Sequence, residues 1–370
     1  MLQSLELKAY DQMMRLRPDE GLDQRILLVT VTDNDVKAQD PSQRRGASLS
    51  DTALAQLLEK LEQYQPRVIG LHLYRDFSVS DQSGNLVNRF QNTEKLIALC
   101  KIGGTDNKGS VPPPPEITPN RLGFSDISRD GDGILRRHIL GMAPGSSDCN
   151  TSYSFSLRVA LLYLAKENIH LKRTPEDDLQ IGSAIFNILE EDSGGYQQLD
   201  ARTYQILLNY RASEKVAQRV TLAEVFNEKL TPEMVKDRIV LIGTTDKSFK
   251  DYWSTPYSTE VAGITIQAHM ASQIISTVLD QRLLIGYWSQ EGELLWIWCW
   301  SLVGGLLAWG LRSQLILGIA IITSIGVLSG LCYVVLIQGI WVLLVPSALA
   351  LVATSGTVLV YRKSLKINNS

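Results

Sequence analysis

The hydrophobic pattern separates a long mixed segment from an almost uncharged C-terminal segment. From Leu294 to Tyr361 the chain has 68 residues and a single charged side chain, Arg312. A helix of about 20 apolar residues crosses a hydrocarbon core about 30 Å thick. With polar breaks at 312–314 and 338–339, the run predicts transmembrane helices over residues 294–311, 315–337 and 340–361.

The cations beside these helices predict their direction. Arg312 follows the first helix, and Arg362, Lys363 and Lys366 lie in the short basic tail 362–370. Lys and Arg close to membrane helices are held on the cytoplasmic side. We therefore expect a multi-pass protein of the plasma (inner) membrane, with residues 1–293 extracytoplasmic and the tail cytoplasmic.

The first residues do not resemble an export signal. The chain opens MLQSLELKAYDQMMRLRPDE, which is charged and amphipathic, whereas a signal peptide has a basic start and an apolar core. Either the first transmembrane helix carries the preceding domain across the membrane, or an anchor helix lies upstream of Met1. We expect the upstream anchor.

The pattern in residues 1–285 predicts an α/β domain. Three apolar, β-branched runs at 25–32, 67–74 and 238–243 are typical of strands that are covered on both faces. Ser50-Asp51 opens a helix whose leucines recur every three or four residues, which predicts a face packed on a core. We therefore expect a mostly parallel central sheet with helices on both faces, followed by an all-α transmembrane region.

Shorter patterns predict the remaining elements. Val220–Asn227 is expected to be a helix opened by a capping box of Thr221 and Glu224. The other expected elements are a helical stretch at 92–101, a hairpin at 123–139 with its turn at 130–133, a helix at 153–167, strands at 181–189 and 204–209, a short strand at 263–266 and a helix at 268–279.

Six segments of the chain match landmarks of a known family. They are LELKAYDQMMRLRP (5–18), RILLVTVTDNDV (25–36), RVIGLHLYRD (67–76), GFSDISRDGDGILRR (123–137), ILLNYR (206–211), and RIVLIGTT with DYWSTPY (238–257). In this order they resemble the CHASE2 family, the extracytoplasmic sensory module of bacterial and especially cyanobacterial signalling proteins. The resemblance implies a sensor domain over residues 1–285 and three membrane helices after it.

The resemblance also implies neighbouring segments and marks two departures. An N-terminal anchor usually precedes such a domain, and a histidine kinase or nucleotide cyclase often follows the third helix. We expect this chain to work without an output module of its own, through a partner, or to be part of a longer protein. His72 stands where the family commonly has Asp, and Gln267 stands where it commonly has His.

The net charge and the positions of the cysteines bear on the possible partners and on a disulfide. The net charge is −3 and no basic patch occurs, which argues against a nucleic-acid partner. Cys299 and Cys332 fall in the predicted membrane helices, whereas Cys100 and Cys149 fall in the outer domain. The latter two either pair in an oxidising compartment or are separate small apolar residues.

Polar residues follow all three predicted strands. In open parallel sheets ligands bind outside the carboxyl ends of the strands, so these residues are expected to meet at one crevice. Alternatively, they cap helices. The candidate ligand-binding residues are Asp33, Asp35, Arg75, Asp76, Arg137, Thr244 and Thr245.

Two arginines, Arg136 and Arg137, follow the predicted hairpin turn. Alternation along a strand would point one of them inward. Such an arginine either clamps a ligand or forms a structural ion pair with an Asp of the crevice.

The chain contains no recognised catalytic or metal-binding motif. Its four histidines have no paired metal spacing, and Asp130-x-Asp132-Gly133 lacks the further ligands of a calcium loop. His72 is interpreted as a core histidine, or as a pH-sensitive residue if it faces the crevice. We expect no enzyme activity and identify no cofactor. The alternatives are an extracytoplasmic enzyme using Asp33 and Asp76, or a structural or assembly protein of the membrane.

Glycines in the membrane helices bear on partners. Gly326-x-x-x-Gly330 and Gly304-Gly305 allow helices to approach closely, either within the three-helix region or between two copies. The expected partners are the lipid membrane, an unidentified small-molecule ligand, and a second copy of the chain or a signalling protein.

Overall fold

The computed structural model describes residues 2–43, 49–80, 84–103, 109–211 and 215–368, which form two compact units. The sheet unit comprises Pro18–Ile188 and Arg202–Arg282, and the helical unit comprises Met1–Arg17, Leu189–Ala201 and Leu283–Ser370.

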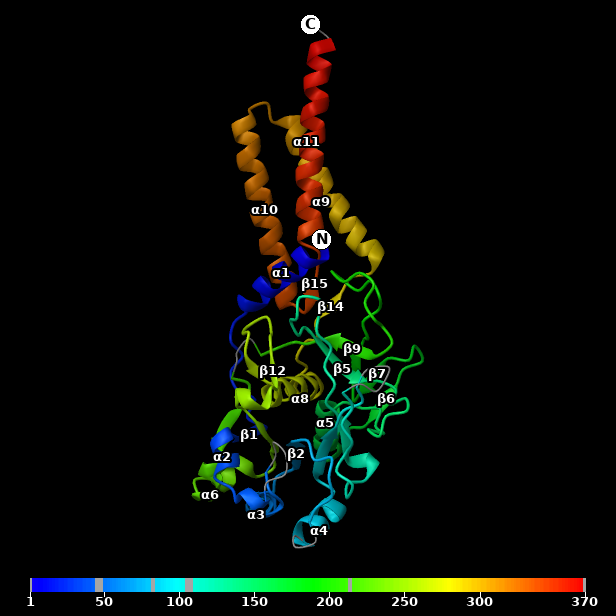
Figure 1. The fold of residues 1–370 in the computed structure, drawn as a ribbon. Coiled ribbons are helices and arrows are strands. Elements are labelled where there is room, and N and C mark those ends of the chain that lie inside the picture. The colour runs from blue at the N-terminus through cyan, green and yellow to red at the C-terminus, as the bar shows by residue number, and fades with distance from the viewer. Residues whose placement is uncertain (1, 44–48, 81–83, 104–108, 212–214, 369–370) are drawn as a thin grey trace. The chain divides into compact units, whose positions relative to one another are not determined.

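The sheet unit, which contains β1, β2 and α3 in Figure 1, is built on a six-stranded parallel sheet with the strand order β10-β1-β11-β2-β3-β4. Every residue of β1, β11 and β2 is buried, as the apolar runs predicted for strands covered on both faces. The parallel central sheet expected from the sequence is therefore confirmed. The strands are β1 (Ile26–Val31), β2 (Val68–His72), β3 (Leu96–Cys100), β4 (Leu122–Phe124), β10 (Gln218–Thr221) and β11 (Ile239–Thr244).

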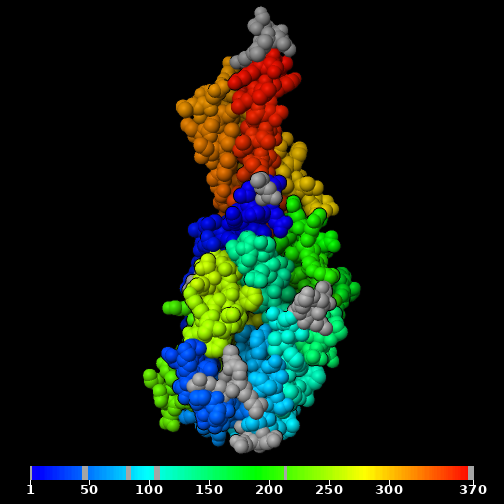
Figure 2. Space-filling view, in the orientation of Figure 1, coloured from blue at the N-terminus to red at the C-terminus, as the bar shows by residue number. Residues whose placement is uncertain are grey.

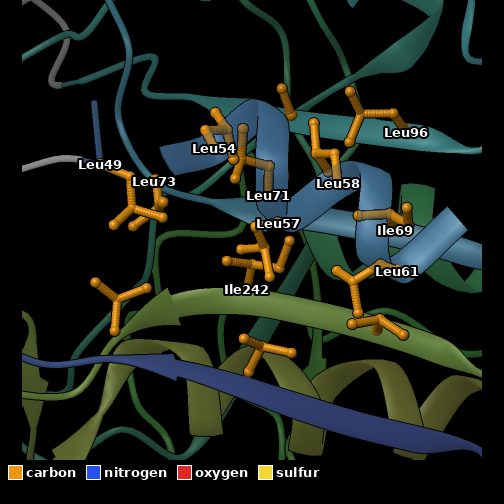
Figure 3. Close-up of a cluster of buried hydrophobic side chains, with 14 of the residues drawn as sticks. Leu49, Leu54, Leu57, Leu58, Leu61, Ile69, Leu71, Leu73, Leu96 and Ile242 are labelled. Atoms are coloured by element: carbon orange, nitrogen blue, oxygen red, sulfur yellow. The ribbon is translucent and has the colours of Figure 1, made fainter. Parts of the chain in front are cut away.

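Helices cover both faces of this sheet. On one face the leucines of α3 (Asp51–Gln63) point onto Ile69 and Leu71 of β2 and Ile242 of β11 (Figure 3). On the other face lie α5 (Phe155–Ala165) and α8 (Gly263–Leu279). Gly70 allows α5 to approach, because an added Cβ would lie 2.9 Å from the Phe155 ring.

Smaller elements complete the sheet unit. The capping box predicted at Thr221 and Glu224 opens α6. β5 pairs antiparallel with β9, β6 to β8 form a three-stranded antiparallel sheet, and β12 pairs with β13. Their bounds are α2 (Asp33–Lys37), α4 (Gly84–Asn92), β5 (Arg137–Gly141), β6 (Leu171–Arg173), β7 (Leu179–Ile181), β8 (Ala184–Phe186), β9 (Tyr204–Leu207), α6 (Leu222–Phe226), α7 (Pro232–Val235), β12 (Tyr252–Trp253) and β13 (Val261–Ala262).

Two of the shorter predictions were wrong because a fully buried segment has no polar face to reveal its period. The expected helical stretch at 92–101 is mostly strand β3, all five residues of which are buried, and the helix α4 precedes it. The expected strand at 263–266 is the start of α8, which is buried from Gly263 to Thr277. Short apolar runs cannot be assigned from periodicity alone.

The expected hairpin at 123–139 was wrong because of tertiary pairing. The turn does form, with the Gly133 N–H donating to the Asp130 carbonyl at 2.8 Å. However, β4 pairs with β3, and β5 pairs with β9, so the two arms belong to different sheets.

The helical unit contains three helices that are long and apolar enough to cross a membrane. They are α9 (Gln290–Gly310), α10 (Gln314–Ile337) and α11 (Val345–Asn368), and α1 (Leu2–Arg15) belongs to the same unit. α10 and α11 lie against each other (Figure 2, orange and red). The three predicted spans are therefore present, with shifted boundaries.

The boundaries shift where polar and extended residues intervene. α9 begins four residues before the predicted Leu294, because the Ser289 hydroxyl accepts a hydrogen bond from the Gly292 N–H at 3.4 Å and caps the helix. α11 begins at Val345 rather than 340, because β15 (Ile340–Trp341) pairs with β14 (Gly286–Tyr287).

The glycines of the membrane helices have different surroundings. Gly304 and Gly305 face α11, and a Cβ added at Gly304 would collide with the Leu351 carbonyl oxygen. A Cβ added at Gly326 or Gly330 would have no described atom within 4 Å. Close packing of α9 on α11 therefore depends on the Gly304-Gly305 pair.

Candidate functional site

A cavity of about 380 Å³ opens at the carboxyl ends of β2, β3 and β11. Ligands of parallel α/β sheets bind at this edge, because the loops that follow the strands leave a crevice there. The cavity is lined by His72, Leu73, Tyr74, Asp76, Phe77, Leu99, Lys101, Thr244, Phe249, Lys250, Asp251 and Trp253.

Two of the candidate residues predicted from the sequence line this cavity. Asp76 follows β2, and Thr244 is the last residue of the adjacent strand β11. The expectation that strand ends meet at one crevice therefore applies to these two residues.

The two aspartates after β1 lie outside the cavity lining. Asp35 accepts hydrogen bonds from the Thr32 N–H at 2.7 Å and the Thr32 hydroxyl at 2.6 Å, which caps α2. Asp33 forms an ion pair with Lys37 and accepts from the Ser248 hydroxyl at 3.3 Å. For Asp35, the structure matches the helix-capping alternative.

Thr245 and Arg75 also lie outside the lining. The Thr245 N–H donates to the Val31 carbonyl at 3.1 Å, joining β11 to β1. The Arg75 side chain is completely buried, where it pairs with Asp51 and donates to the Leu49 carbonyl at 2.7 Å. It therefore ties the chain after β2 to the start of α3.

Arg137 belongs to a separate buried ion-pair cluster. Its Nε donates to Asp130 at 2.8 Å, and the neighbouring Arg136 donates to Asp130 at 2.6 Å and to Asp132 at 2.7 Å. Both guanidinium groups are buried, so the expectation that only one points inward was wrong. The partner carboxylates, Asp130 and Asp132, come from the turn at 130–133. They are bonded to arginine, whereas the carboxylates of a calcium loop bind the ion.

The cavity also contains a histidine–carboxylate pair that was not predicted from the sequence. His72 Nδ1 lies 3.7 Å from Asp251 Oδ2, and the ring packs edge-on against Phe155. Burial lowers the pKa of His72, and the negative charge of Asp251 opposes that shift. At neutral pH the ring is therefore held uncharged beside a carboxylate.

Asp251 is held in place by its neighbours. Its Oδ1 accepts from the Trp253 indole N–H at 2.8 Å, and its carbonyl accepts from the Gly263 N–H at 2.9 Å. The carboxylate also lies directly over Gly263, where any added Cβ would collide with it. The Asp-Tyr-Trp segment and this glycine thus depend on each other, although they are separated in sequence.

The remaining lining gives the cavity both charge signs and aromatic walls. Lys101 follows β3, and Lys250 has a left-handed φ of 56° after a short 3-10 helix at Lys247–Phe249. Phe77 and Trp253 add flat apolar surfaces. Such a lining suits a small polar molecule that carries both an acidic group and hydrogen-bond donors. No group of three metal-ligating side chains occurs among the residues that the structure describes.

A disulfide lies next to the cavity. Cys100 and Cys149 are bonded, with their Cα atoms 5.5 Å apart, and both side chains are fully buried. Of the two alternatives left by the sequence, the structure has the paired one. The bond joins the end of β3, immediately before Lys101, to the segment that leads into α5.

Comparison with known families agrees with this architecture. The CHASE2 domain model matches residues 1–306. Comparisons with curated proteins and with solved structures give no match. CHASE2 domains are sensory and extracytoplasmic, which fits the three candidate membrane spans in residues 290–365. Because the match covers most of the 370 residues, this chain belongs to the CHASE2 family.

Proposed function

We propose that this protein is a membrane-anchored sensor whose sheet unit binds a small zwitterionic molecule in the cavity at the carboxyl edge of the sheet. The observation that carries the proposal is the mixed lining of that cavity. Lys101 and Lys250 supply positive charge for an acidic group, while Asp76 and Asp251 accept hydrogen bonds from an ammonium group.

We further propose that this site binds without catalysing a reaction. The two carboxylates of the enzyme alternative, Asp33 and Asp76, are not both in the cavity lining. His72 and Asp251 are the remaining candidate acid–base pair, and His72 is 8 % exposed. A general base must reach the proton that it removes. Binding is therefore the simpler use of these residues.

The proposed direction of the chain places the sheet unit outside the cell and the tail in the cytoplasm. Arg362 donates to the Leu311 carbonyl at 2.9 Å, so the basic tail and the turn containing Arg312 lie at the same end of the helical unit. That placement supports one cytoplasmic end for both basic segments. In Ser313→Cys, a membrane-impermeant thiol reagent is expected to label the new cysteine from the cytoplasmic side only, and labelling from the outer side would contradict this direction.

The ligand proposal is tested by thermal unfolding of the full chain in lipid nanodiscs, with free amino acids as the probe panel. A ligand that binds only the folded state stabilises it by an amount that grows with the logarithm of ligand concentration above Kd, so at least one amino acid is expected to raise the unfolding temperature with increasing concentration. Asp251→Asn should abolish that shift, whereas Asp148→Asn, at an exposed position outside the lining, should keep it.

Three outcomes would count against the proposal. A panel in which no amino acid raises the unfolding temperature would exclude amino-acid zwitterions. An equal shift in the wild type and Asp251→Asn would move binding away from this cavity. Consumption of an amino acid by the purified chain, lost in Asp251→Asn, would show an enzyme instead.

A further inference from the structure

A second cavity lies within the helical unit, where its membrane helices begin. It has a volume of about 350 Å³, and α1, residues 192–197, the first two turns of α9 and residues 343–346 line it. All of these segments belong to the helical unit. The cavity is therefore separate from the site in the sheet unit, and its use is independent of the proposed function.

One side of this cavity is formed by a buried carboxylate that caps a membrane helix. Glu6 is 1 % exposed and accepts hydrogen bonds from the Val345 N–H at 2.7 Å, the Leu344 N–H at 3.2 Å and the Trp341 indole N–H at 3.2 Å. A negative charge is favourable at the N-terminus of a helix. Burial nevertheless raises the pKa of Glu6, which marks the scarcity of water around it.

A second carboxylate in the same lining lacks such compensation. Glu293 is 8 % exposed, and its Oε1 is buried without a hydrogen-bond partner among the described residues. A third acid, Asp192, also lines the cavity, and the described lining contains no Lys, Arg or His. Burying a carboxylate without a donor or a cation is costly, so this lining is incomplete as it stands.

The remaining walls define the rest of an occupant. Leu294, Ile297, Leu343 and Pro346 face the cavity with apolar surface. An occupant that suits the whole lining carries one positive charge and an apolar chain. The charge must also bring N–H donors for Glu293, which an ammonium group with attached hydrogens has and a quaternary ammonium lacks.

We propose that this cavity binds a primary ammonium group attached to an apolar chain, with the ammonium between Glu6 and Glu293. The charge-assisted hydrogen bonds would satisfy Glu293, and the chain would lie along Leu294 and Ile297. A free alkylamine and the headgroup of an aminophospholipid share this chemistry. The cavity stands where α9 and α11 enter their spans, so both kinds of amine can reach it.

The test uses the full chain in phosphatidylcholine nanodiscs at pH 7, with n-hexylammonium as the probe. We expect hexylammonium to raise the unfolding temperature with increasing concentration, because it binds only the folded state. Hexanol, which lacks the charge, and tetramethylammonium, which lacks N–H donors, should not do so. In nanodiscs that contain phosphatidylethanolamine, loss of the hexylammonium response together with a higher starting temperature would identify the lipid headgroup as the occupant; an unchanged response would identify a free amine.

Matched variants locate the binding. Glu293→Gln should weaken hexylammonium binding by about tenfold or more, because a charge-assisted bond becomes a neutral one. Glu291→Gln, at an exposed position in the same turn of α9, should leave binding unchanged. Ile297→Trp keeps every charge and fills the cavity, so it should block binding even if Glu293→Gln does not fold.

Other results would contradict ammonium binding. The proposal is overturned if hexylammonium does not raise the unfolding temperature in either lipid, or if Ile297→Trp and Glu293→Gln both respond as the wild type does. An unfolding temperature that depends on pH through Glu293, without any response to amines, would show that the two carboxylates share a proton instead of binding an ammonium.

Discussion

Removal of the Cys100–Cys149 disulfide is expected to destabilise the sheet unit by about 4 kcal/mol. The bond closes a loop with a sequence separation of 49 residues. Chain entropy for a loop of that size removes roughly 14 cal/mol/K from the unfolded ensemble, or about 4 kcal/mol at 25 °C. Both half-cystines are fully buried in the core that includes the leucines of α3, so the bond constrains the chain inside the sheet unit.

Hydrogen exchange of the full chain in nanodiscs can measure this loss within the sheet unit alone. In Cys100→Ala/Cys149→Ala, the most protected amides of β1 and β11 should exchange about a thousandfold faster, since each 1.4 kcal/mol corresponds to about a factor of ten. Cys299→Ala is the matched control, because that thiol is free and exposed in α9. It should leave those amides unchanged.

A smaller effect would refute the reasoning in a specific way. If exchange in β1 and β11 rises less than about tenfold, the unfolded chain must already be held compact near these residues, since the loop length itself is fixed. If only amides close to Cys100 respond, the disulfide stabilises the edge of the sheet rather than the whole unit.

Three further predictions concern the two units. Burial lowers the pKa of His138 to about 3, so the unfolded state takes up a proton at a higher pH than the folded state does. The free energy of unfolding should therefore fall by up to about 5 kcal/mol as the pH drops from 6.5 towards 3. In pH-dependent unfolding, His138→Gln should flatten this slope, and an unchanged slope would show that another group causes it. Asp130→Asn removes the carboxylate that both buried arginines share, and should lower the free energy of unfolding in denaturant by about 3 kcal/mol. A loss no larger than that of Asp132→Asn, at a more exposed carboxylate, would contradict this. Gly304→Ala should push α9 away from α11 and lower the free energy of unfolding of the helical unit in nanodiscs by about 1–3 kcal/mol. Gly326→Ala, where the added Cβ meets no described atom, should have little effect. Equal losses in the two variants would refute the packing argument.

Three strands of the sheet could be predicted from the residue types in the sequence. The strands β1, β2 and β11 are β-branched runs between polar residues, so both their length and their burial can be inferred. The prediction for β3 failed because a run of five apolar residues, all of them buried, fits a buried helix as well as a buried strand. The prediction for β4 and β5 failed because the partners of a strand are chosen by tertiary packing, not by the turn between them.

The site was predictable only in part, because a polar residue at a strand end has several possible uses. Asp76 and Thr244 line the cavity, but Arg75 is committed to Asp51, and Asp35 caps its own helix. The local sequence does not distinguish these uses. Asp251 was missed for the opposite reason, since its partner His72 is far away in the sequence and no motif joins them.

The two buried carboxylates of the helical unit, Glu6 and Glu293, were also not predicted from the sequence. Glu293 precedes Leu294, where the uncharged run begins, so hydropathy places it outside the span. The Ser289 cap extends α9 past it, and Glu293 is buried there. Glu6 lies near the other end of the sequence, and only the fold brings it to Val345. A signal could have been found in the serine and acidic residues at 289–293, a pattern that is typical of a helix start.

Helix α8 connects the cavity of the sheet unit with the residues that precede β1 in the same unit. Its first residue, Gly263, lies under the Asp251 carboxylate, and its residues are buried from there to Thr277. Its last turns are fixed by Ser272 and Ser276, which contact Asp23, and Asp280 pairs with Arg25 at 2.8 Å. Because the Asp251 carboxylate lies on Gly263 and the other end of α8 is held by Asp23 and Arg25, a shift of Asp251 toward α8 would have to displace the first turn of that helix.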